Sequence, residues 1–127
     1  MKTVEVDPKK WVQFCLRLEE FCRGAMLTIE TTTNDGRTIR TVAQEVPLRH
    51  LALDDTTDPC NTNLVIETGA LNEKPLRHTV VEPIHIRLKN GNGSDRYNHL
   101  QILAETGTTN LRLNPGLNLA LLKGLEL

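Results

Sequence analysis

The sequence predicts an α+β domain, mainly β, in which an N-terminal helix is followed by an antiparallel meander of about six strands. Two observations carry this prediction. The first segment has the apolar spacing of a helix, and from Ala25 onward the apolar residues alternate with period two between turn-forming sequences. We expect the strands to form a small, bent barrel of SH3-like or Sm-like type, with a flat helix-on-sheet sandwich as the alternative. The helix should cover one face of the sheet or plug one end.

The helix is predicted from its caps and from one apolar stripe. Asp7 is a good N-cap, and Pro8 suits the first turn because its missing N–H would have no partner there. Gly24 favours the left-handed conformation that ends a helix. Apolar side chains recur at positions i, i+3, i+4, i+7 and i+11, namely Trp11, Phe14, Cys15, Leu18 and Cys22. This stripe must be buried, and the sheet is the expected cover.

A hairpin is predicted immediately after the helix. Residues 26–33 and 37–46 alternate in polarity around Asp35-Gly36, a dipeptide that tolerates the positive φ angles of a type I′ turn. The alternation of the second segment breaks in its middle, so we expect a bulge or a twist near Thr41.

The rest of the meander is predicted from shorter segments. Further strands are expected at residues 48–53, 63–68, 76–89, 99–105 and 109–113, with a final hairpin around Thr106-Gly107. Pro47 should limit pairing, and Pro83 should lie on an edge or at a bend, because proline cannot donate to a strand ladder.

The chain of 127 residues fits a single domain, predicted to span residues 1–114, followed by a leucine-rich tail over residues 115–127. Leucine dominates the tail from Leu117 to Leu127. Such a segment either folds back as a short helix that completes the core, or exposes an apolar edge that recruits a second subunit as a homodimer.

Composition argues against several classes of protein. With 15 basic and 16 acidic residues, the net charge of −1 gives no positive field for nucleic acid or anionic lipid. Aromatic residues make up 3% of the chain, too few for a base-stacking surface. Nucleic-acid binding therefore ranks third among the functions considered, through a local basic patch of Arg77, Arg87, Lys89 and Arg96.

The sequence contains no membrane span of ~20 apolar residues and no apolar export-signal core near its first residues. Its three cysteines, an odd and sparse number, fit a reducing compartment. We therefore expect a cytoplasmic protein.

The cysteines do not form a metal-binding pattern. Cys15 and Cys22 lie inside the apolar stripe without a neighbouring histidine or a CxxC pair, so we expect buried, hydrophobic side chains. Cys60 lies in an acidic loop that would raise the pKa of its thiol and weaken it as a nucleophile. We expect no metal and no cofactor.

The same loop carries the oxygen ligands that a hard cation prefers. Its carboxylates are followed by asparagine side chains, but the loop lacks the register and closing glutamate of an EF-hand, so a solvated turn is the simpler reading. A cation site would use Asp54, Asp55 and Asp58.

The tetrapeptide Pro-Leu-Arg-His occurs twice, at residues 47–50 and 75–78. The flanking patterns differ, so we interpret the repeat as a coincidence. His78 is predicted to face inward from its strand, where a partly buried imidazole needs a partner such as Glu82 or a backbone carbonyl. The alternative is a small ligand-binding or enzymatic barrel that uses Arg77, His78 and Glu82, with His50 as a further candidate.

Several stretches together resemble a known family. Trp11-x-x-Phe14 on the opening helix, an early hairpin, "VPLRHLALDD" and "LRHTVVEPIHIRLKN" before a terminal hairpin are similar to an uncharacterised bacterial family, the domain of unknown function numbered 5335. The resemblance covers about residues 7–114. It implies a single small bacterial domain with no assigned activity, and hence no catalytic or binding residues to carry over. The leucine-rich tail departs from the usual ending of the family.

No nucleophile paired with a base and no phosphate-binding loop is recognisable in the sequence. The sequence therefore favours a non-enzymatic module over an enzyme. We expect it to bind a protein partner, or a second copy of itself, through a sheet edge or through the tail.

Overall fold

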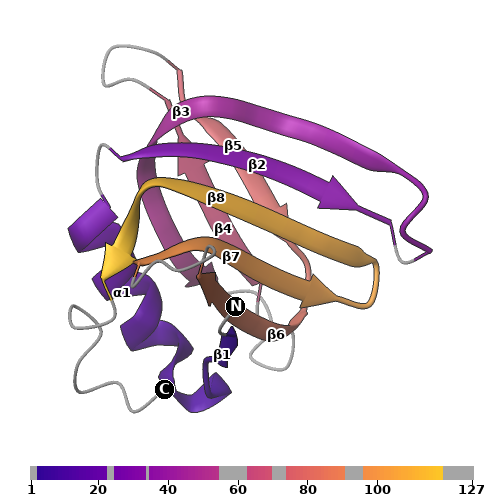
Figure 1. The fold of residues 1–127 in the computed structure, drawn as a ribbon, viewed down its shortest axis with the longest axis horizontal. Coiled ribbons are helices and arrows are strands. Elements are labelled where there is room, and N and C mark those ends of the chain that lie inside the picture. Colours follow the sequence, from indigo (N-terminus) through magenta and orange to yellow (C-terminus); the bar gives the residue numbers. More distant parts are fainter. Residues whose placement is uncertain are drawn as a thin grey trace.

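A computed structural model describes residues 3–22, 25–33, 35–54, 63–69, 74–90 and 96–118. One α-helix and an antiparallel sheet of eight strands build this part of the chain, which is mostly β as predicted (Figure 1). The elements are β1 (Thr3–Glu5), the 3-10 helix η1 (Pro8–Lys10), α1 (Trp11–Cys22), β2 (Met26–Thr32), β3 (Ile39–Asp54), β4 (Asn63–Thr68), β5 (Leu76–Val80), β6 (Pro83–Asn90), β7 (Arg96–Ala104) and β8 (Gly107–Asn118). No helix within the described ranges is long and apolar enough to cross a membrane.

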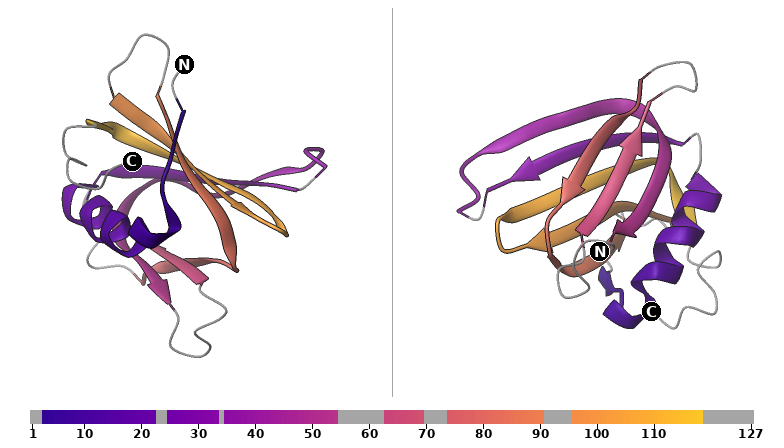
Figure 2. Two further views of the ribbon diagram at one scale, coloured as in Figure 1. Left: turned by 90° about the horizontal axis from the view of Figure 1, so that it is seen from below. Right: turned by 180° about the vertical axis from the view of Figure 1, so that it is seen from behind.

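The strand order in the sheet is β1-β6-β7-β8-β2-β3-β4-β5. The sheet is strongly bent, but β1 and β5 remain as its two ends, so it does not close into a barrel. Seen from behind, β4 and β5 cross over the layer that contains β2, β7 and β8 (Figure 2). The predicted barrel is therefore an open, folded-over sheet, and β3 passes from one layer to the other.

The bend arises within β3. The sequence predicts two strands divided at Pro47, whereas β3 is continuous from Ile39 to Asp54 and changes its neighbour there from β2 to β4. Two register shifts against β2 confirm the bulge expected near Thr41, and Glu45 has a left-handed φ of 48°. Bulges bend a strand and increase its twist, which turns β3 out of the first layer.

Two further predictions on the strands need correction. The predicted strand over residues 76–89 divides at Glu82, which has a φ of 48°, and Pro83 starts β6 just after this corner, at a bend as expected. β5 then pairs with β4, whereas β6 pairs with β7 and β1. β1 was not predicted, because three residues are too short to show an alternation.

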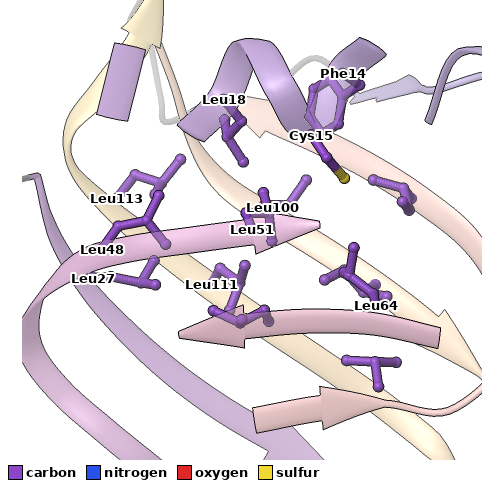
Figure 3. Close-up of a cluster of buried hydrophobic side chains, with 14 of the residues drawn as sticks. Phe14, Cys15, Leu18, Leu27, Leu48, Leu51, Leu64, Leu100, Leu111 and Leu113 are labelled. Atoms are coloured by element: carbon purple, nitrogen blue, oxygen red, sulfur yellow. The ribbon is translucent and has the colours of Figure 1, made fainter. Parts of the chain in front are cut away.

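The helix and its burial agree with the prediction. The Asp7 carboxylate accepts a hydrogen bond from the Lys9 N–H at 3.0 Å, and the first turn is the 3-10 helix η1. All five residues of the apolar stripe of α1 are buried. Of these, Phe14, Cys15 and Leu18 lie over leucines of the sheet (Figure 3). Gly24, the predicted end of the helix, lies outside the described residues.

β2 pairs with β3 only as far as Pro47, and beyond this point α1 lies beside β3. After Pro47, the Leu48 N–H donates to the Ala25 carbonyl oxygen at 3.1 Å, and the Leu51 N–H donates to Glu19 Oε1 at 3.0 Å. The imidazole of His50 also contacts the Glu19 carboxylate. The Leu48 N–H is thus satisfied by the residue just before β2, and the Leu51 N–H by a side chain of α1.

The last strand extends beyond the predicted domain boundary. β8 runs to Asn118, and Leu117 lies opposite Tyr97 of β7, so residues 115–118 belong to the sheet. Residues 119–127 lie outside the described residues, and the two predictions for the tail stay predictions.

Candidate functional site

The two ends of the folded sheet differ in chemistry. Inward positions on β2 and β8 form successive cross-strand pairs: Leu27 with Leu113, Ile29 with Leu111, and Thr31 with Thr109. The first two pairs are buried apolar residues on the side of α1. Toward the other end of the strands, threonine replaces the aliphatic side chains, and this end of the sheet has no helix over it (Figure 1).

Two adjoining cavities of about 210 and 340 Å³ open at this end. Thr31 and His78 line both of them. The first cavity lies between the end of β2, residues 78–81, and the β7–β8 turn, and the second lies between β5 and the bulged part of β3 that includes Arg40. We call the residues around these two cavities the mouth. The larger volume is at the lower end of the range for small-ligand sites, and the smaller one is below it.

His78 faces the mouth, as its predicted inward position requires. It lies opposite Ile66 of β4, whose side chain is fully buried. The imidazole is half-buried and makes no hydrogen bond to any residue that the structure describes. Burial lowers its pKa, because a charged ring is poorly solvated there. The sequence predicted a core histidine with a hydrogen-bond partner. Among the described residues, the His78 ring has none.

The other two candidates of the predicted binding site lie elsewhere. Arg77 is opposite Glu67 of β4 and exposed, on the face of β5 opposite to His78. Glu82 is exposed at the β5–β6 corner, where its N–H donates to Asn63 Oδ1 at 3.2 Å. Of the three predicted residues, only His78 lines the mouth.

The two Pro-Leu-Arg-His copies lie on β3 and β5, the two neighbours of β4. Leu48 and Leu76 are both opposite Thr68. A register shift at Arg49 then places His50 opposite Glu67, whereas His78 is opposite Ile66. Successive positions point to opposite faces of a sheet, so the two histidines do not face one site.

Within the predicted basic patch, Arg77 lies on a strand that does not pair with the strands of the other residues. Arg77 lies on β5, at one end of the strand order, whereas Arg87 and Lys89 lie on β6, next to the other end. Arg87 Nε forms an ion pair with Glu5 Oε1 at 3.1 Å. The side chain of Arg96 lies outside the described residues.

The cysteines of α1 are packing residues, as predicted. Burial, with a smaller contribution from the nearby Glu19 carboxylate, raises the pKa of Cys15 to about 12. Burial raises the pKa of Cys22 to about 11, so both thiols are protonated at neutral pH. Within the described ranges, no three His, Cys, Asp or Glu side chains gather where they could hold a metal ion. Cys60 and the acidic loop of Asp55 and Asp58 lie outside these ranges.

Sequence reasoning missed the threonines of the mouth and Arg40. The inward series Leu27, Ile29, Thr31 and its partner series on β8 are visible as an alternation that ends in threonine, so this signal was present. The place of Arg40 could not be read, because it depends on the register of a bulged strand.

The His78 environment predicts how stability depends on pH. The folded-state pKa is below the ordinary value of 6.5, so the unfolded chain binds the proton first as the pH falls. The stabilisation is complete above about pH 6.5 and is lost as the pH falls through the folded-state pKa. We expect urea unfolding to show a smaller loss of stability from pH 7 to 5 in His78→Gln than in the unmodified protein. His85→Gln, which alters a partly exposed histidine that does not line the mouth, is the control. An equal loss in the unmodified protein and in His78→Gln would contradict this prediction.

Comparison of the chain with models of protein families, with curated proteins and with solved structures gave no match. Membership of the family that the sequence resembles stays a prediction.

Proposed function

We propose that the protein is a non-enzymatic interaction module that self-associates by pairing the β5 strands of two copies edge to edge. The observation that carries this proposal is the unprotected edge of β5. We further propose that the protein lies in the cytoplasm and belongs to the bacterial family that its sequence resembles.

Edge strands invite pairing with another chain unless they are short, bulged or covered. In the described part of the chain, β1 is an edge of three residues, and the outer side of β3 before Pro47 is interrupted by two bulges. β5 has neither protection: its five residues pair with β4 in one unbroken register. Two apolar residues beside this edge, Leu76 at the start of β5 and Val81 directly after its end, are 45% and 53% exposed.

The backbone of β5 presents hydrogen-bonding groups outward at Thr79. The Leu51 N–H is bonded to Glu19, so Leu51 and its partner Ile66 are a non-hydrogen-bonded pair of β3 and β4. Ile66 therefore points its backbone groups toward β5 and bonds with His78. By alternation, the N–H and C=O of Thr79 point away from β4, toward the edge.

The sequence of β5 is self-complementary in one antiparallel register. With His78 at the twofold axis, Leu76 lies opposite Val80 of the second copy and Arg77 lies opposite Thr79, so apolar residues meet and the arginines stay apart. The two His78 rings then lie opposite each other and, with their lowered pKa, are neutral at pH 7. A different register, with Arg77 of one copy opposite Arg77 of the other, would bring two positive charges together and is disfavoured.

Sedimentation equilibrium up to about 1 mM protein tests the proposal, because an interface this small implies weak affinity. We expect a reversible monomer–dimer equilibrium that Thr79→Pro abolishes, since proline removes the outward N–H without breaking the ladder to β4. Thr79→Val keeps the N–H and should keep the dimer. Circular dichroism should show the same fold in both variants.

Deleting residues 119–127 separates the edge from the leucine-rich tail. Dimerisation that survives Thr79→Pro but is lost with the deletion would place the interface on the tail and contradict pairing through β5. A monomer at all concentrations would contradict self-association altogether. The enzymatic alternative has less support, because Arg77 and Glu82 do not share the mouth with His78.

A further inference from the structure

The mouth is lined by hydrogen-bond donors and by no carboxylate. Its described residues include Arg40, His78 and threonines of β2, β3, β5, β8 and the β7–β8 turn, of which Thr31 and Thr109 lie on the inward face of the sheet. No Asp or Glu is among them. Hydroxyl, imidazole and guanidinium groups together form the donor set that proteins use to hold oxyanions.

Arg40 is directed to this site by strand register. It lies opposite Thr31, and side chains of directly opposed residues share one face of a sheet. Two other arginines of the sheet are neutralised, Arg87 by Glu5 at 3.1 Å and Arg112 by Glu30 at 3.0 Å. Among the described residues no carboxylate forms an ion pair with Arg40, which lines the second cavity.

The opposite wall and the floor supply neutral donors. His78 faces Arg40 from β5 across the second cavity, and within the described chain its ring has no hydrogen-bond partner. Thr109, on the inward face next to Thr31, is only 6% exposed although it lies at the open end of the sheet. Thr31 and His78 line both cavities, whereas Arg40 lines the second and Thr109 the first, so these donors surround two adjoining spaces, and Arg40 brings positive charge to the second.

We propose that the mouth binds a small oxyanion, a phosphate or an organic carboxylate, between Arg40, His78 and the threonine hydroxyls. The guanidinium supplies the charge and a two-pronged donor, the imidazole donates one N–H, and the hydroxyls adjust to the remaining oxygens. The cavities of about 210 and 340 Å³ accommodate an anion of this kind but not a large cofactor. This inference does not depend on pairing of β5.

Heteronuclear NMR titration tests whether the mouth binds an oxyanion. Inorganic phosphate and citrate are two separate probes, and sodium chloride at matched ionic strength is the reference. We expect saturable shifts of the Thr31 and Thr109 amides and of the His78 ring with at least one oxyanion. Binding of phosphate alone identifies the phosphate class, binding of citrate alone the carboxylate class, and binding of both a general oxyanion site. Shifts no larger than those caused by chloride would overturn the proposal.

Two variants separate a built site from general charge attraction. Arg40→Gln should weaken binding by about tenfold or more, because a charged hydrogen-bonding partner is lost. Arg37→Gln removes the same charge from the same β2–β3 hairpin without touching the mouth, and it should leave binding unchanged. Equal weakening by both variants would mean non-specific attraction and overturn the proposal.

The pH dependence of binding gives a second readout. Sulfate, whose own charge is constant in this range, is the probe for this readout: an anion beside His78 favours the protonated ring, so its affinity should rise as the pH falls from about 7.5 to 6. Arg40 of β3 is the one other charged group that lines the mouth among the described residues. His78→Asn should remove the pH dependence, and its persistence in that variant would contradict the role of His78.

Discussion

Replacing Phe14 with alanine is expected to lower the free energy of unfolding by about 3–5 kcal/mol. The Phe14 ring is completely buried on the inward face of α1, over the leucines of the bent sheet (Figure 3). Its removal leaves a cavity where the helix meets the sheet, and a rigid sheet cannot collapse to fill it. Since a domain of this size is stable by about 5–15 kcal/mol, we expect the variant to be close to unfolding at 37 °C.

Chemical denaturation followed by circular dichroism measures this effect. Val12→Ala is the matched control, because Val12 lies on the same helix with its side chain 58% exposed. A surface substitution of this kind should change stability by less than about 0.5 kcal/mol. Similar losses in the two variants would show that α1 contributes through its helical propensity and not through burial of its stripe.

Replacing Gly107 with alanine is expected to cost about 2–4 kcal/mol, the second largest effect. Gly107 starts β8 with a φ of 149°, which residues with a side chain rarely adopt. An added Cβ would also lie 2.6 Å from the backbone carbonyl oxygen of Thr32. The Thr32 carbonyl oxygen cannot easily move away from the added Cβ, because Thr32 is held in the ladder to β8 by its pairing with Thr108.

Gly36 offers a control that separates these two causes. It has a φ of 73° in the β2–β3 loop, but an added Cβ there would meet nothing within 4 Å. Gly36→Ala should therefore cost only the backbone strain, about 1 kcal/mol. If both variants lose the same stability in thermal and urea unfolding, close packing of the β7–β8 turn against β2 has no measurable effect.

The loop around Gly36 illustrates what local sequence can specify. The Asp35 carboxylate accepts hydrogen bonds from the Thr33 hydroxyl at 2.6 Å and from the Arg37 N–H at 3.0 Å, and these bonds, the hydroxyl first, lower its pKa. The Thr33 N–H donates to the Thr38 carbonyl oxygen at 3.0 Å. All partners lie within five residues, so the hairpin was predictable from the sequence alone. Its turn differs from the predicted two-residue type I′ turn at Asp35-Gly36, because the Gly36 N–H donates to the Thr33 carbonyl oxygen at 2.9 Å and the Arg37 N–H to the Asp35 side chain.

The candidate site was predictable only in part. The inward position of His78 follows from the alternation of β5 and was confirmed. The mouth itself forms only where strands β2, β3, β5, β7 and β8 come together. The sequence pattern does not predict that β5 faces the ends of β2 and β8. Arg40 was missed for this reason.

The sequence by itself determined the capped helix with its buried stripe, the alternation of most strands, both tight hairpins and the bends at Thr41 and Pro83. Each depends on contacts between residues a few positions apart, which backbone geometry and side-chain size decide locally. Only the tertiary structure decided that β3 joins two layers, that β5 and β6 separate at Glu82, and that one end of the sheet stays open. These features depend on which distant strand satisfies each backbone N–H and C=O, and bulges of a single residue change that choice.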